Sequence, residues 1–152
     1  MIWELPHMPS NEKQIQFKLK NVQVTDCFFK KPETRLEKRQ NYGFNFSFKA
    51  HFDPKIQTAT IILNAIIYYS PSQKIEIGKI TTKTDFTVKN FNEFFVDEDK
   101  VTFPKDFIVM LMSISYSTLR GIILEKSTGI LAETIILPII NIRDLKQYNS
   151  KE

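Results

Sequence analysis

The chain has 152 residues, of which 42% are apolar and 25% are charged. A chain of this length is expected to form one domain and to bury about 70% of the surface that it exposes when unfolded. Its 21 basic and 17 acidic residues give a net charge of +4. This excess is small and scattered, whereas nucleic-acid binding requires a dense basic stripe, so we expect no nucleic-acid partner.

Cysteine content and the N-terminal sequence restrict the compartment. Cys27 is the only cysteine, which excludes an internal disulfide and a CxxC zinc site. Glu4, Pro6 and Pro9 stand where a signal peptide needs an apolar core, and no segment approaches the length of a membrane span. We therefore expect a cytoplasmic protein without membrane insertion. Its expected parts are an irregular arm (1–14), one domain (15–148) and a tail (149–152).

The first expected strand covers residues 16–29. Phe17 and Leu19 alternate with polar residues, which is typical of a half-buried strand. The alternation slips after Lys20, which predicts a bulge near Asn21. The lysines that flank this pattern favour an edge strand. A charged connector, which includes the basic stretch 30–39, then leads to the second strand.

Alternating phenylalanines define the second expected strand. This row consists of Phe44, Phe46, Phe48 and Phe52. Such a row is either the apolar face of a core strand or the lining of a groove for a polypeptide. Ordinary core packing against a helix is the more common outcome, and aromatic surface suits varied ligands because it demands no fixed hydrogen bonds.

Two further strands are expected at 58–69 and 74–90. The middle of the third strand is apolar on both faces, which indicates a central strand covered on both sides, by this chain or by a partner. The alternation of the fourth strand slips at Gly78, and glycine inside a strand is typical of a bulge or bend.

An amphipathic helix is expected after Phe103-Pro104, because apolar residues recur there at helical spacing. Gly121 is either the C-terminal cap of this helix or a residue inside a longer one. A mostly extended segment follows, and Asn141 is expected to cap a short helix that ends near Tyr148. Strands followed by a helix predict an α+β fold: a four-stranded antiparallel meander of long strands, with the main helix packed on one face and a short C-terminal segment.

No arrangement of titratable residues indicates catalysis. His7 and His51 are far from each other and from Cys27 in the sequence, and Cys27 is expected to be a small buried residue at a strand end. The acidic run 97–99 lacks the spacing of an EF-hand loop. We therefore expect neither an enzyme nor a bound metal or cofactor.

Two sequence blocks resemble the SecB-like family of protein-export chaperones. The first is Met112–Leu124 (MSISYSTLRGIIL), and the second is Leu137–Asn141 (LPIIN). The family has a helix that ends in Ser-x-x-x-Arg-Gly, matched here by Ser117, Arg120 and Gly121, followed by a Pro-x-x-Asn stretch. The resemblance covers roughly residues 15–145, because the four long strands before these blocks also match the family's architecture.

The resemblance implies a chaperone that holds non-native, extended polypeptides without ATP. It also implies a homo-oligomer, a dimer or a tetramer, built by joining sheets edge to edge and packing the first helices between sheet pairs. The helix residues expected at that interface are Phe107, Leu111, Ile114, Ser115 and Thr118. Arg120 is expected to make a structural contact, with carbonyls near the helix end as the candidate acceptors, and no catalytic role.

The sequence departs from the export-type members, which end in a long second helix and are usually acidic. A chaperone dedicated to one client or system, such as a toxin–antitoxin or specialised secretion system, therefore fits better than general export. Two alternatives stay open. One is a non-catalytic assembly or adaptor protein with a fixed protein partner, and the other is a small-molecule-binding protein with a cavity between helix and sheet.

Overall fold

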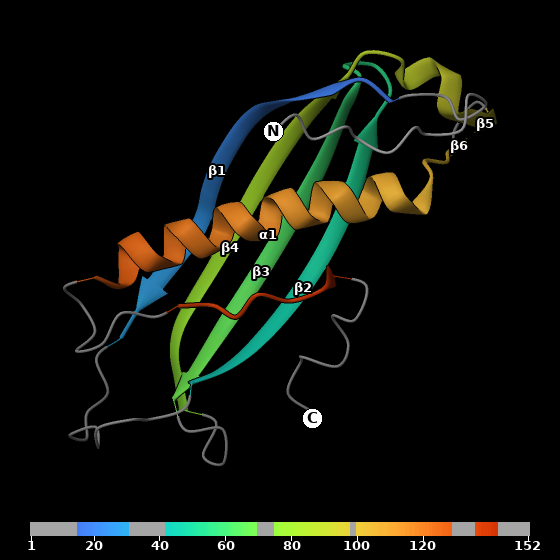
Figure 1. The fold of residues 1–152 in the computed structure, drawn as a ribbon. Helices are drawn as coiled ribbons and strands as arrows, with labels where there is room; N and C mark the ends of the chain where they lie inside the picture. Colours follow the sequence, from blue (N-terminus) through green and yellow to red (C-terminus); the bar gives the residue numbers. More distant parts are fainter. Residues whose placement is uncertain (1–14, 31–41, 70–74, 98–99, 129–135, 143–152) are drawn as a thin grey trace, which may run out of the picture.

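Four long strands form one antiparallel sheet in the computed structural model (Figure 1), which describes residues 15–30, 42–69, 75–97, 100–128 and 136–142. The strands are β1 (Phe17–Phe29), β2 (Tyr42–Asp53), β3 (Thr58–Tyr69) and β4 (Ile75–Val88). Their bounds agree closely with the expected ones. The predicted arm, most of the connector, the β3–β4 turn and the last helix lie outside the described residues.

The order of strands in the sheet is β1-β4-β3-β2. Consecutive strands β2, β3 and β4 form the predicted meander, but β1 pairs with β4 and not with β2. The prediction of a simple meander is therefore wrong for the first strand. Alternation of apolar residues fixes which face a side chain occupies, and it does not specify which strands become neighbours. The central position expected for β3 is confirmed.

Both predicted irregularities are present. The β1–β4 register shifts between Leu19 and Asn21, as the slip after Lys20 predicts, and shifts again between Val24 and Asp26. In the β3–β4 pairing, Ile67 lies opposite Gly78 and Tyr68 lies opposite Glu76, so one residue next to Gly78 is bulged.

Gly78 also makes room for an aromatic ring from the neighbouring strand. Phe29 lies opposite Gly78, and a Cβ at position 78 would lie 2.8 Å from Cδ1 of that ring. We expect Gly78→Ala to lower the free energy of unfolding by about 1–3 kcal/mol, as overpacking typically does. Urea denaturation measures this change. The double variant with Phe29→Ala should lose less than the sum of the two single variants; additive losses would contradict the proposed clash.

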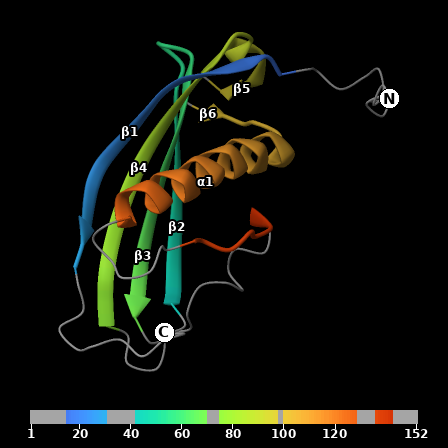
Figure 2. The same cartoon turned by 60° about the vertical axis from the view of Figure 1, so that its left-hand side comes forward.

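Helix α1 (Lys105–Ser127) lies across one face of the sheet, where it contacts β3 and β4 (Figures 1 and 2). Gly121 lies inside this helix and not at its cap, which settles the open alternative. Before α1, a short 3-10 helix, η1 (Phe91–Phe94), leads into a small hairpin of β5 (Phe95–Asp97) and β6 (Lys100–Val101). The sequence pattern did not predict this hairpin, whose strands are too short for a periodic signal.

The length and composition of α1 correct the expectation that no segment approaches the length of a membrane span. Its 23 residues include a stretch with a mean hydropathy of 1.7, so the helix is long and apolar enough to span a membrane by length and composition. A single helix of this kind is weak evidence, because core helices meet the same criteria. Leu111, Leu119 and Ile123 of α1 are fully buried against the sheet, but only 33% of that stretch is buried, so one side of the helix packs on the sheet and the other side does not.

The core beneath α1 consists of two clusters. The first surrounds Ile77, Ile80, Tyr116 and Leu119, and it also contains Leu137 from the C-terminal part of the chain. The second is strongly aromatic: Phe17, Phe52, Phe86, Phe91, Phe94, Phe103 and Phe107. The abundance of phenylalanine in the sequence is thus explained largely by this end of the core.

Cys27 is exposed, which corrects the expectation of a buried residue. It lies on β1, where most side chains are exposed because α1 packs over β3 and β4. Partial burial nevertheless raises the pKa of the Cys27 thiol; the charge of Lys126 opposes this rise and that of Asp26 adds to it. A raised pKa lowers the thiolate fraction at neutral pH, so exposure alone does not make this cysteine reactive.

Candidate polypeptide-binding site

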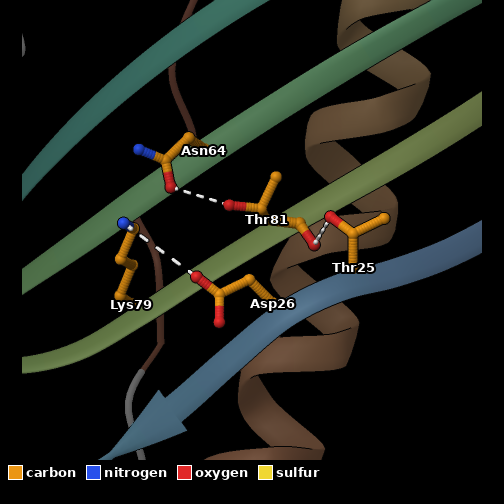
Figure 3. Close-up of polar contacts among 5 residues, drawn as sticks. All are labelled: Thr25, Asp26, Asn64, Lys79 and Thr81. Carbon is orange, nitrogen blue, oxygen red and sulfur yellow. Dashed lines mark hydrogen bonds and ion pairs between the residues drawn. The ribbon is translucent and has the colours of Figure 1, made fainter.

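The two faces of the sheet differ in chemistry. On the face away from α1, Thr81 donates a hydrogen bond to Asn64 at 3.0 Å, and Lys79 lies 4.0 Å from Asp26 (Figure 3). On the same face, Thr60 donates to Asp85 at 2.7 Å. Polar side chains are satisfied there by their neighbours across the strands. The same face also carries the half-buried Ile62 and Ile66 of β3, so it is mixed in character.

The predicted phenylalanine row lies on the helix-bearing face of β2. Phe46 is 4% exposed, and its ring meets that of Tyr116 edge to face at 5.3 Å. Phe44 stacks on Phe46 at 6.2 Å, and Phe44 and Phe48 are half-buried. Phe52 is half-buried at the other end, against Phe103. The row is thus core at its centre, with aromatic surface accessible on either side.

The predicted interface residues of α1 separate into two groups. Phe107, Leu111 and Ser115 are at most 4% exposed and point into the core. Ile114 and Thr118 are half-buried on the outward side. Together with Met110, Ser113 and Ser117 they line a shallow, widely open hollow on that side.

The outward side of α1 is unusual for an exposed helix. No charged residue occurs between Asp106 and Arg120. The hydroxyls of Ser113 and Thr118 donate to carbonyls one turn earlier in the same helix, at 2.7 and 2.9 Å. Such bonds direct the donors into the helix. The surface that remains is smooth and weakly polar, as helix faces that pack against other protein tend to be.

The described C-terminal residues 136–142, which we name the strap, lie beside α1 over the same face of the sheet (Figures 1 and 2). Leu137 and Ile142 are buried in the first core cluster, and Ile140 packs against it. Ile139, by contrast, is 84% exposed. The strap belongs to neither sheet, so side chains and bonds from α1 hold it.

Two residues of α1 bind the backbone of the strap. Tyr116 donates its hydroxyl hydrogen to the carbonyl of Pro138 at 2.6 Å, and Arg120 donates from Nε to the carbonyl of Leu137 at 3.1 Å. The expected structural contact of Arg120 is present, but its acceptor is a carbonyl of the strap and not one near the helix end. The local sequence pattern did not single out Tyr116, which resembles any other aromatic residue of the helix core.

Burial raises the pKa of the Tyr116 hydroxyl to about 12, against an opposing effect of the Arg120 charge. Because an unfolded tyrosine has a pKa near 10, the unfolded state loses its proton first as the pH rises. We expect the free energy of unfolding to fall between pH 10 and pH 12, because the protonated form is the one that folding favours. Urea denaturation at several pH values measures this fall. Tyr116→Phe should remove the part due to this group; an unchanged pH dependence in that variant would contradict the assignment.

Among the described residues, no group of three or more His, Cys, Asp or Glu side chains is placed to hold a metal ion. His51 is exposed on β2, and His7 lies outside the described residues.

Comparison with known proteins agrees with this geometry at the level of fold. No protein-family model and no curated protein matches the sequence. Among solved structures, the Mycobacterium tuberculosis SecB-like chaperone Rv1957, in complex with a ChAD peptide from the Rv1956 HigA1 antitoxin, superposes with a TM-score of 0.58. The alignment covers 82% of this chain and 87% of that chain, at 11% sequence identity. The chain has a SecB-like fold.

A second solved structure, a protein of unknown function from Streptococcus agalactiae, superposes with a TM-score of 0.45 at 10% identity. That alignment covers 84% of this chain and 100% of the other. The SecB-like fold therefore rests on the first comparison, together with the four-stranded antiparallel sheet and its single main helix.

Proposed function

We propose that this protein is an ATP-independent holdase that binds extended, non-native polypeptides on the helix-bearing face of its SecB-like sheet. The observation that carries the proposal is how the fold holds residues 136–142: the side chains of Leu137 and Ile142 are buried in the core, and α1 bonds the carbonyls of Leu137 and Pro138. The neighbour of the same fold binds a peptide from an antitoxin. Binding of this kind requires no catalytic group.

The proposed client-binding surface includes the accessible parts of Phe44, Phe48 and Phe52. These half-buried rings flank Phe46, which itself has little surface to offer while the strap is in place. Burial of client side chains would supply the affinity, at about 25 cal/mol per Å² of apolar surface before the cost of ordering the client. Such a surface tolerates varied sequences, as a holdase requires.

A homo-oligomer, a dimer or a tetramer in the cytoplasm, completes the proposal. Its support is the outward side of α1, which carries no charged residue between Asp106 and Arg120 and where the hydroxyls of Ser113 and Thr118 bond within the helix. We expect Ser117→Arg to lower the assembly mass, because Ser117 is exposed in the hollow on that side. Light scattering coupled to size exclusion measures the mass. Asn92→Arg, an exposed residue of η1, is the matched control and should leave the mass unchanged. Equal masses for all three proteins would contradict this interface.

The deciding experiment is suppression of aggregation. Several unrelated, chemically unfolded proteins are diluted into buffer with and without this protein, and turbidity is followed while the assembly mass is recorded in the same buffer. Suppression of several of them at near-stoichiometric amounts supports a general holdase. Suppression of none removes that function and leaves a dedicated adaptor with one fixed partner as the better explanation.

A further inference from the structure

The strap is held as a peptide ligand is held. In recognition of extended peptides, main-chain hydrogen bonds supply affinity that does not depend on sequence, and pockets for alternate side chains supply selectivity. Here Tyr116 and Arg120 bind two consecutive carbonyls, of Pro138 and Leu137, and the side chain of Leu137 is 1% exposed. The two hydrogen bonds go to backbone carbonyls, which every residue type has. Only the pocket that holds Leu137 selects for a particular side chain.

The strap also lies against the phenylalanine row. The ring of Phe46 contacts the ring of Tyr116, whose hydroxyl binds the strap, and Leu137 and Ile142 belong to the same cluster as Phe46. Phe44 and Phe48 pack against that cluster from the side. Removal of the strap would therefore uncover apolar surface that is continuous with the half-buried phenylalanines.

Because the strap pairs with no strand of either sheet, its departure would leave all the backbone ladders of the sheet intact. Departure would break the aliphatic contacts of Leu137, Ile140 and Ile142 and the two bonds from Tyr116 and Arg120. An incoming peptide that offers similar side chains and its own carbonyls would restore most of that loss.

We propose that the strap is an internal occupant of the client groove, and that an extended, uncharged, aliphatic-rich client segment displaces it and accepts the hydrogen bonds of Tyr116 and Arg120. This inference rests on the proposed holdase function and names its binding groove. The strap then sets the apparent affinity: when the groove is open in only a tenth of the molecules, the apparent Kd is about ten times the intrinsic one.

The test uses a peptide that fits the groove by construction: residues 136–142 as a synthetic, fluorescein-labelled peptide with two lysines added at each end. Its binding to the full chain is measured by fluorescence anisotropy. Leu137→Ser combined with Ile142→Ser removes the buried anchors of the strap and keeps Tyr116 and Arg120, which donate to its carbonyls. This release variant should bind the peptide about tenfold or more tightly than the unchanged protein.

Ile139→Ser provides the matched control, because Ile139 lies in the same segment and is 84% exposed. It should bind the peptide as the unchanged protein does. Adding Arg120→Met or Tyr116→Phe to the release variant should reverse the gain by about tenfold, since the donors for the client's carbonyls are then lost. Nonspecific binding of the peptide to a loosened core would not depend on these two hydrogen-bond donors.

A measurement on the unchanged protein covers the possibility that the release variant does not fold. Saturating peptide should increase amide hydrogen exchange within residues 136–142 and leave the exchange of β3 and β4 unchanged. Unaltered exchange of the strap at saturation would overturn the proposal.

The outcomes separate this inference from the holdase function. If the protein suppresses aggregation but the release variant binds the peptide no more tightly, the strap is a structural segment and the client groove lies elsewhere. If no form binds the peptide and none suppresses aggregation, both proposals are wrong. A tighter release variant whose gain disappears with Arg120→Met supports the inference.

Discussion

Replacement of Phe103 by alanine should lower the free energy of unfolding by about 3–5 kcal/mol, the usual cost of deleting a buried aromatic ring. Phe103 is 4% exposed, and its ring centroid lies 4.9 to 5.2 Å from those of four neighbours: Phe52, Phe91, Phe94 and Phe107. These contacts join β2, η1 and α1. The variant thus leaves a cavity where three elements meet, and aromatic pairs contribute beyond the area that they bury.

Urea denaturation followed by far-UV circular dichroism measures this loss. Phe28→Ala is the matched control, because Phe28 is 42% exposed on β1 and should lose about 1 kcal/mol or less. Equal losses in the two variants would contradict the central position of Phe103 in the aromatic cluster.

The strands were predictable because the signal for them is local. The alternation of Phe17 and Leu19 and its slip after Lys20 predicted both β1 and its first bulge, and the bulge is present. Strand order was not predictable in the same way. The pairing of β1 with β4 joins residues such as Phe17 and Val88, which are far apart in the sequence, and alternation carries no information about such pairs.

The candidate site was predictable only in part, and Phe46 shows why. Its place in the row predicted an apolar face, but its burial depends on Tyr116 and on the strap, which approach it from elsewhere in the chain. Cys27 shows the converse. Its sequence context is that of a core residue, yet it is exposed because α1 packs over β3 and β4.

The resemblance to SecB-like proteins was more informative than the local pattern at one position. Arg120 stands in the family-like block Ser117 to Gly121, and a structural contact with carbonyls was expected from that block. The structure identifies the acceptor as the carbonyl of Leu137, which lies in the second family-like block. The two blocks are therefore bonded to each other in the fold.

Replacement of Arg120 by methionine should lower the free energy of unfolding by about 1.5–3 kcal/mol. Arg120 is half-buried, and its Nε donates to the carbonyl of Leu137 at 3.1 Å, so the change removes a bond from a charged donor and leaves that carbonyl without it. Methionine retains most of the apolar stem, which keeps the loss of packing small. Lys126→Met, an exposed cation in the last turn of the same helix, should cost less than about 1 kcal/mol.

The combination of Arg120→Met with Tyr116→Phe tests whether the two bonds hold the strap as one unit. Each residue binds one of two neighbouring carbonyls in the same segment. If loss of one bond lets the strap separate from α1, the other bond is already broken, and its removal then costs little further stability. The double variant should therefore lose at least about 0.5 kcal/mol less than the sum of the single variants. Strict additivity, with unchanged hydrogen exchange in residues 136–142, would mean that the strap stays in place through its aliphatic anchors alone. In that case the buried side chains of Leu137 and Ile142 determine whether the groove is open, and the hydrogen bonds from Tyr116 and Arg120 do not.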